Sequence, residues 1–232
     1  MKTLLQIFTF CCVIFLIYTP GYTKAELEIV DSKFDFGITP NNSIISKSFW
    51  FKSIGEDTLK ISNTKTGCTC AIMPLEQDYI APGDSMQVKF IWDVGRKIFK
   101  IGRYPYIFTN AKDDAYRMEL TAEIHQSLDS LQPISISPYK GEFSKLKEKS
   151  IDEMEFVFTN HSDKDINISI VYIDTTECSI QLPKMVAANS TQVGKIKVKN
   201  NFLDKEFNGS VTFLLDNFQK TKITIPYRRK IY

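Results

Sequence analysis

Apolar and polar residues alternate along most of the chain, which is the period of half-buried antiparallel β-strands. Met118, Leu120 and Ala122 alternate with charged or hydroxyl side chains, and Ile166 and Ile168 alternate with polar ones in the same way. No window has a convincing helical period. The pattern therefore predicts an all-β protein.

The alternation predicts about seven strands in each half of the chain. In the first half they span residues 27–36, 43–52, 57–63, 69–73, 86–93, 103–110 and 115–125. In the second half they span residues 133–137, 151–160, 164–174, 178–182, 192–199, 208–216 and 220–230. Turn-forming residues such as Pro82-Gly83-Asp84 separate them. Seven short strands in about 100 residues are typical of an immunoglobulin-like β-sandwich.

The two halves also repeat each other at a constant offset. The segment from Phe49 to Ile61 recurs as Phe156 to Ile168, and Thr109-Asn110 recurs as Asp216-Asn217. Both displacements are equal, since 156 − 49 = 107 and 217 − 110 = 107. A repeat as long as a small domain indicates two copies of one fold in tandem.

We therefore expect two immunoglobulin-like sandwich domains, at residues 26–126 and 133–232. Residues 127–132, which are mostly small or polar and precede a proline, are expected to form the linker. Because this linker is short, the two sandwiches are expected to touch.

The first 25 residues have the features of a secretory signal peptide. Lys2 precedes an apolar run from Leu4 to Tyr18, and a small-residue pattern predicts cleavage after Ala25. Cys11 and Cys12 lie inside the apolar run and are interpreted as hydrophobic residues that leave with the signal. The alternative is an uncleaved anchor, but the run is shorter than the ~20 residues that a spanning helix needs. The rest of the chain predicts no transmembrane segment, so we expect an exported protein that is periplasmic, outer-surface-associated or secreted.

The charge balance argues against binding to nucleic acid. Lys and Arg number 29 against 27 Asp and Glu, which leaves a net charge of +2. The basic segment Arg228-Arg229-Lys230 is interpreted as a solvated strand terminus rather than a binding patch.

An ordered set of short motifs in the first half resembles a known family. The set contains Phe34-Asp35-Phe36-Gly37, the segment with Gly55 in its turn, Gly67-Cys68-Thr69-Cys70, Ile80-Ala81-Pro82-Gly83, Lys100-Ile101-Gly102 and Thr109-Asn110. In this order it resembles the secreted bacterial domain-of-unknown-function family 1573. The resemblance covers Leu27 to Ile124 and implies an immunoglobulin-like sandwich in a Bacteroidetes-like envelope, akin to pilus chaperones and major sperm protein. It implies no activity.

The sequence departs from the family pattern at several positions. Ser53 replaces the usual Asn of the Asn-x-Gly turn, and Ala71 stands where Thr is usual. The second half has Asn189-Ser190 in place of Pro-Gly, and only Cys178 in place of two cysteines. It resembles a degenerate second copy.

Cys68 and Cys70 are the residues whose spacing carries chemistry. In an extended strand their Cα atoms would be about 7 Å apart, which is too far for an unstrained disulfide, although a bend beside Gly67 would bring them within reach. Three interpretations stay open: two packed thiols, a labile disulfide or redox pair, and a soft-metal site for Cu(I) or Zn. We expect a reduced, metal-free pair and no cofactor.

The other candidate residues favour structural roles. Cys178 is expected to pack in the second core, and His125 and His161 are expected to be solvated rather than metal ligands. Glu76 and Asp78 are interpreted as solvated loop charges rather than a catalytic pair. The aromatic residues Tyr104, Tyr106 and Phe108 are expected to face the sandwich core.

No catalytic motif is recognised in the sequence. The leading hypothesis is a non-enzymatic envelope protein whose sandwiches bind or scaffold an envelope or cell-surface protein. The alternative is a thiol protein in which Cys68 and Cys70 form a redox couple or hold a soft metal.

Overall fold

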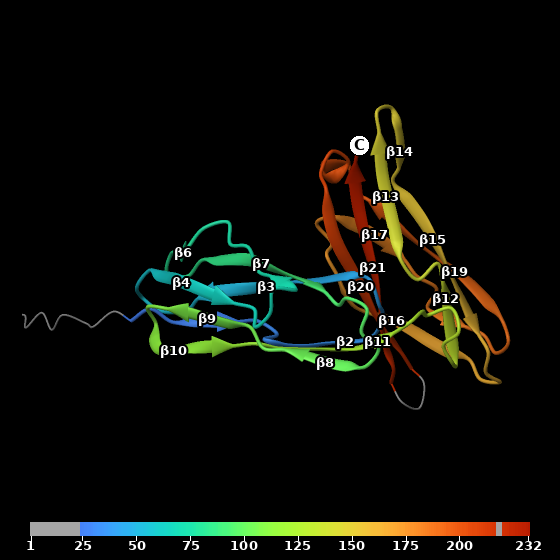
Figure 1. Ribbon diagram of the computed structural model, residues 1–232, viewed down its shortest axis with the longest axis horizontal. Coiled ribbons are helices and arrows are strands. Elements are labelled where there is room, and N and C mark those ends of the chain that lie inside the picture. Colours follow the sequence, from blue (N-terminus) through green and yellow to red (C-terminus); the bar gives the residue numbers. More distant parts are fainter. Residues whose placement is uncertain (1–23, 217–219) are drawn as a thin grey trace, which may run out of the picture.

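The computed structural model describes residues 24–216 and 220–232. Its described part is built almost entirely of β-strands, which form two sandwiches set at an angle to each other (Figure 1). No helix in this part is long and apolar enough to cross a membrane. The predicted signal peptide lies outside the described residues, apart from Lys24 and Ala25.

The first sandwich packs a four-stranded sheet against strands of two other sheets. The four-stranded sheet has the order β1 (Leu27–Ile29), β3 (Ile44–Ser53), β7 (Ser85–Asp93) and β5 (Ala71–Ile72). Across the core lie two groups of strands: β10 (Lys112–Arg117), β9 (Tyr106–Thr109), β4 (Leu59–Lys65) and β6 (Tyr79–Ile80), and then β2 (Lys33–Pro40), β11 (Glu119–His125) and β8 (Lys100–Arg103).

The second sandwich has a four-stranded sheet of corresponding order. It contains β12 (Ile134–Ser137), β15 (Glu153–Asn160), β19 (Thr191–Val198) and β17 (Cys178–Gln181). The facing strands are β18 (Met185–Val186), β16 (Ile166–Ile173), β20 (Phe207–Leu215), β21 (Lys222–Ile231), β13 (Gly141–Leu146) and β14 (Lys149–Ile151). A short 3-10 helix, η1 (Asn200–Phe202), precedes β20.

Each sandwich has its own hydrophobic core. The first core contains buried side chains between Ala25 and Ile124, and its aromatic centre includes Phe36 and Trp92, whose ring centroids are 6.3 Å apart. The second core begins at Leu128, which is fully buried although it lies in the predicted linker. The alternating pattern therefore identified the faces that build two separate cores, which confirms the predicted fold class.

The two sandwiches share one sheet. Strand β2 of the first sandwich pairs with β11 and, at Ile38, with Ile223 of β21 in parallel. A nine-stranded sheet consequently runs from one sandwich into the other, and Figure 1 shows β2, β11 and β21 meeting at the junction. A Cβ at Gly37 would lie 2.2 Å from the carbonyl oxygen of Lys222, so the close approach of the two backbones at this joint requires glycine.

The structure adds a hairpin where no strand was predicted. Strands β13 and β14 pair with each other, and β13 also pairs in parallel with β21. This hairpin changes the environment of Arg229, which was expected to be solvated. Arg229 is fully buried, and its Nη1 lies 2.7 Å from Oδ1 of Asp152. That interpretation of Arg229 is wrong, whereas the neighbouring Arg228 is exposed and pairs with Glu142.

The aromatic residues near β9 also differ from expectation. Tyr104 and Tyr106 are each 40% exposed, whereas Ile107 is fully buried. The inward face of this segment is therefore the one that carries Ile107. The outward tyrosine Tyr104 is covered by the guanidinium of Arg117, 4.3 Å from the ring centroid, so its apolar ring is partly shielded without entering the core.

Candidate functional site

Cys68 and Cys70 form a disulfide, and their Cα atoms are 5.2 Å apart. The separation is short because the two residues lie in a turn, and β5 begins only at Ala71. Gly67 has a φ of 80°, and the Thr66 hydroxyl donates to the carbonyl oxygens of Cys68 (3.0 Å) and Ala71 (2.8 Å). The expectation of a reduced pair is therefore wrong, because the turn brings the two sulfurs together.

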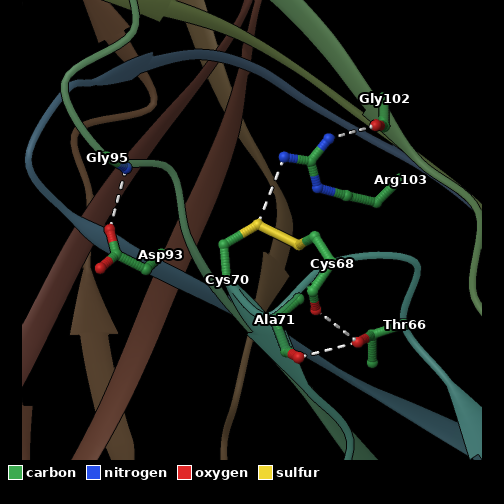
Figure 2. Close-up of a disulfide and its surroundings, with 8 residues drawn as sticks. All are labelled: Thr66, Cys68, Cys70, Ala71, Asp93, Gly95, Gly102 and Arg103. Atoms are coloured by element: carbon green, nitrogen blue, oxygen red, sulfur yellow. Dashed lines mark hydrogen bonds between the residues drawn. A yellow bond between two sulfur atoms is a disulfide. The ribbon is translucent and has the colours of Figure 1, made fainter.

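Arg103, at the end of β8, reaches this disulfide from across the sandwich. Figure 2 shows its guanidinium beside the sulfur of Cys70, and Nη2 lies 3.3 Å from that sulfur. Nη1 donates to the carbonyl oxygen of Gly102 at 2.8 Å, and Cζ lies 5.0 Å from the ring centroid of Trp92. These contacts hold the guanidinium in place beside both the Trp92 ring and the disulfide.

The Arg103 side chain is not fully satisfied by its neighbours. Its Nε is buried and has no hydrogen-bond partner in the described part of the chain. Burial lowers the pKa of the Arg103 guanidinium from its usual value, yet an arginine remains protonated in proteins. The site therefore keeps a positive charge next to Cys70. No sequence signal marks Arg103, apart from its place directly after the Lys100-Ile101-Gly102 motif.

The disulfide is a weak structural cross-link. It closes a ring of three residues, and the chain-entropy relation gives about 1.6 kcal/mol for such a loop, against about 3 kcal/mol for one of fifteen residues. Both cysteines are half-buried at the margin of the first core. The disulfide thus combines modest stabilisation with a position at the edge of the core.

The remaining candidate residues lie apart from this turn. His125 Nε2 is 2.7 Å from Oε1 of Glu123, and His161 Nε2 is 2.8 Å from the hydroxyl of Ser135. Glu76 and Asp78 are exposed. Within residues 24–216 and 220–232, no group of three or more His, Cys, Asp or Glu side chains is placed to hold a metal ion.

Cys178 is a free cysteine in the second core and is fully buried. Burial is the largest of the causes that raise the pKa of its thiol to about 12, and the nearby Glu177 acts in the same direction. The thiol is therefore protonated and shielded, which fits the predicted packing role.

Several motif residues fix turns or strand ends in the first sandwich. Gly83, which follows Pro82, has a φ of 78°, in the left-handed region that favours glycine. The side chain of Asn110 accepts a hydrogen bond from the amide of Lys60 (2.8 Å) and donates to the carbonyl oxygen of Thr58 (3.0 Å). The family-like residues at these positions thus hold the loops of the sandwich together.

Other motif residues lie beside the inner face or the chain start. Phe36 is fully buried, and Phe34 packs edge-on against it with ring centroids 4.9 Å apart. A Cβ at Gly55 would lie 2.2 Å from the carbonyl oxygen of Lys24. The chain around Lys24 and Ala25 therefore runs directly over this turn, and Ala25 itself is buried.

Polar side chains fill the contact between the two sandwiches. The amide of Ser46 donates to the hydroxyl of Ser210 at 2.9 Å, and the amide of Ser48 donates to the hydroxyl of Tyr172 at 2.8 Å. The hydroxyl of Ser48 also donates to Oδ2 of Asp174 at 2.9 Å. These buried bonds, together with the shared sheet, fix one sandwich against the other.

A cleft of about 560 Å³ lies beside this contact and is lined from both sandwiches. Its charged lining consists of Asp93 and Arg96 from the first sandwich and of Lys140, Glu142 and Arg228 from the second. Glu142 pairs with Arg228, and Gly95 donates its amide to Oδ1 of Asp93 at 2.9 Å. Cations therefore outnumber anions on the walls, and both anions already have partners.

The arrangement of Lys140 connects the two walls of the cleft. Its Nζ donates to the carbonyl oxygen of Asn42 in the first sandwich at 3.1 Å. Burial lowers the pKa of Lys140, the charge of Arg228 acts in the same direction, and Glu142 opposes them. Arg96, on the opposite wall, is exposed. An acidic group entering the cleft would relieve the repulsion between these cations.

Comparison with known proteins supports the family resemblance of the first sandwich. Residues 27–124 match the family model described as "Protein of unknown function (DUF1573)", which confirms the resemblance over that span. A search of curated proteins found no match.

The solved structures that align with this chain have very low sequence identity to it. A protein of unknown function from Porphyromonas gingivalis W83 aligns over 88% of this chain and 98% of its own, with 7% identity and a TM-score of 0.38. The E. coli chaperone DraB aligns over 90% and 97%, with 6% identity and a TM-score of 0.35. The ASH / PapD-like domain 7 of human CEP192 aligns over 45% and 88%, with 8% identity and a TM-score of 0.39. Likenesses this weak carry no argument about function.

Proposed function

We propose that the protein is exported and that the cleft between its two sandwiches is a non-catalytic site that binds an envelope or cell-surface protein. The observation that carries this proposal is the cleft itself, which has a volume of about 560 Å³ and polar walls from both sandwiches. The shared sheet and the buried serine contacts hold those walls at a fixed spacing. A preformed site costs little ordering free energy when a partner binds.

The charge of the walls indicates the chemistry of the partner segment. Arg96, Lys140 and Arg228 line the cleft against Asp93 and Glu142, and both of these carboxylates are engaged. An acidic loop or strand of the partner would therefore be favoured over a basic one.

Photo-crosslinking tests the proposal directly. Two variants of the full chain are expressed in the native cell, each with one photoreactive amino acid. One carries it at Asn208 in the cleft, and the other carries it at Asp113, which is exposed on β10. The expected result is one saturable crosslinked protein from Asn208 and none from Asp113. Equal crosslinking from both positions, or none from Asn208, would contradict cleft binding.

Charge-reversal variants test the proposal independently, by measuring the affinity for the isolated partner protein. Arg96→Glu and Lys140→Glu should each weaken its binding about tenfold, because each replaces attraction by repulsion at the cleft wall. Lys112→Glu, on the exposed β10 strand, is the matched control and should bind as the unmodified protein does. Equal affinities for all three variants would exclude the cleft as the binding site.

The export and the ancestry of the chain are part of the same proposal. The predicted signal peptide with cleavage after Ala25 supports an exported protein. The offset of 107 residues in the sequence and the corresponding orders β1-β3-β7-β5 and β12-β15-β19-β17 support an origin by tandem duplication. A soft-metal site at Cys68 and Cys70 is not proposed, because the disulfide engages both sulfurs.

A further inference from the structure

The disulfide turn of the first sandwich has surroundings that a purely structural cross-link does not need. Cys68 and Cys70 are separated by one residue, so the bond restrains very little chain. Both residues are half-buried at the core margin rather than sealed inside it. A guanidinium from a different sheet, that of Arg103, contacts one of the two sulfurs.

We propose that Cys68 and Cys70 form a redox-active disulfide that oxidises a protein dithiol, with Arg103 stabilising the Cys70 thiolate that leaves. This inference does not depend on binding in the interdomain cleft. It assigns a reaction class to the turn and makes Arg103 a catalytic residue, because its guanidinium contacts the leaving sulfur.

The two sulfurs are not equivalent, and the difference sets the direction of attack. Nη2 of Arg103 lies 3.3 Å from the sulfur of Cys70. A cation at this distance stabilises a thiolate much more than a neutral disulfide sulfur, and a leaving thiol of lower pKa leaves faster. Nucleophilic attack is therefore favoured at Cys68, with Cys70 as the leaving group.

The Arg103 guanidinium is already oriented beside Cys70 before the negative charge of the thiolate develops. Its ring contact with Trp92 and its hydrogen bond to Gly102 hold the guanidinium in place. Its Nε is a buried donor without a partner among the described residues. The developing thiolate thus meets an oriented cation whose donors are not all used.

The exchange is balanced in atoms and electrons. A thiolate of the substrate, formed by loss of one proton to water, attacks the sulfur of Cys68, and the sulfur–sulfur bond breaks with Cys70 leaving as a thiolate. The second substrate thiol transfers its proton to the Cys68 sulfur as it attacks the mixed disulfide. The substrate gains a disulfide and loses two electrons, and the cysteine pair gains them.

Return to the oxidised form requires a two-electron oxidant. A small-molecule disulfide such as oxidised glutathione supplies it by the reverse exchange and is itself converted into two thiols. The protein then transfers one disulfide in each cycle.

The experiment titrates the reduced full chain and equilibrates it with glutathione. Alkylation by iodoacetamide across pH, with the modified site located by mass spectrometry, gives the pKa of the Cys70 thiol. We expect this pKa to lie below the usual value of about 8.5 and to rise by about one unit or more in Arg103→Gln. At a pH above both pKa values, the equilibrium with glutathione should shift tenfold toward the disulfide for each unit, which corresponds to about 30 mV.

Two further variants separate a redox role from a structural one. Arg103→Lys keeps the charge and should retain part of the low pKa, and the variant Arg117→Gln, on β10, should leave the pKa and the equilibrium unchanged. If Arg103→Gln does not fold, the measured pKa of Cys70 in the unmodified protein and in Arg103→Lys still decides the matter.

Either of two results would overturn the proposal. One is a Cys70 pKa at or above that of an ordinary thiol in the folded, reduced protein. The other is a disulfide that a reduced dithiol peptide does not open while the chain remains folded.

Discussion

Lys89, on β7 of the first sandwich, forms an ion pair with Glu177, which precedes β17 of the second. The Glu177 side chain is 7% exposed, and its Oε2 is buried without a partner among the described residues. Burial is the main cause that raises the pKa of Glu177 to about 7, with Lys89 opposing it and Asp174 adding to it. The contact between the sandwiches therefore contains a carboxyl group that titrates near neutral pH.

Because of this carboxyl group, we expect the free energy of unfolding to depend on pH. The folded pKa of about 7 lies above the usual glutamate value of 4.5, so the folded state holds the proton more tightly than the unfolded state between these pH values. The free energy of unfolding should consequently fall as pH rises from about 4.5 to 7, by on the order of 3 kcal/mol. Urea unfolding at a series of pH values, compared between the unmodified protein and Glu177→Gln, isolates this contribution.

A change in Lys89 checks the same assignment from the other side. Lys89→Met removes the attraction that lowers the pKa of Glu177. The pH range over which the free energy of unfolding falls should therefore extend to higher pH. Identical pH profiles for the unmodified protein and Glu177→Gln would contradict the assignment.

Substitution of two adjacent arginines, Arg228 and Arg229, should lower the free energy of unfolding by very different amounts. Arg229 is fully buried and donates through Nη2 to the carbonyl oxygen of Leu203 at 2.6 Å, in addition to its ion pair with Asp152. Arg229→Met leaves these acceptors without their donor and should lower the free energy of unfolding by about 3 kcal/mol. Arg228→Met breaks only an exposed pair with Glu142 and should cost less than about 1 kcal/mol.

Urea unfolding of the two single variants measures this contrast. Equal destabilisation by both substitutions would show that the β13–β14 hairpin does not bury Arg229 in solution.

Substitution of Gly55 is expected to disturb the chain segment Lys24–Glu26, which lies over its turn. The amide of Ile54 donates to the carbonyl oxygen of Glu26 at 3.0 Å, and the amide of Glu56 donates to that of Lys24 at 3.1 Å. Gly55→Ala places a methyl group against this segment and should cost about 1–3 kcal/mol. Hydrogen exchange at the amides of Ile54 and Glu56 should speed up in the same variant.

Gly83→Ala is the matched control, because a Cβ there meets no atom within 4 Å although its φ is 78°. It should cost about 1–2 kcal/mol through backbone strain alone and leave the exchange of the Ile54 and Glu56 amides unchanged. Unaltered exchange in Gly55→Ala would mean that Lys24–Glu26 does not lie over the turn. Cleavage after Ala25 would remove Lys24 from this contact, so the variant also reports on the mature N-terminus.

The sequence predicted the strands well wherever one face of a strand is buried and the other is solvated. It placed Met118, Leu120 and Ala122 on an inward face, and all three are fully buried. It failed at Tyr106, because alternation gives two faces but does not say which one the partner sheet covers. The pairing of the strands decides that choice, and Ile107 faces the core.

The candidate site was predictable only in its chemistry and not in its geometry. The spacing of Cys68 and Cys70 identified the pair, but a strand was expected where the chain makes a turn. Arg103 lies 33 residues from Cys70 in the sequence, and nothing local marks it as a partner of the sulfur. The polar contact between the sandwiches was equally hidden, because Ser48 has the character of a solvated outward residue until Tyr172 covers it.

The position of β21 in the shared sheet has a consequence for the order of assembly. This strand pairs with β20, β13 and β2, and it follows all three in the sequence. While the chain emerges from a ribosome or a translocation channel, the first sandwich can therefore collapse alone, whereas the second core and the joint must wait for the same segment. The addition of this one late strand therefore completes the second sandwich and joins it to the first in the same step.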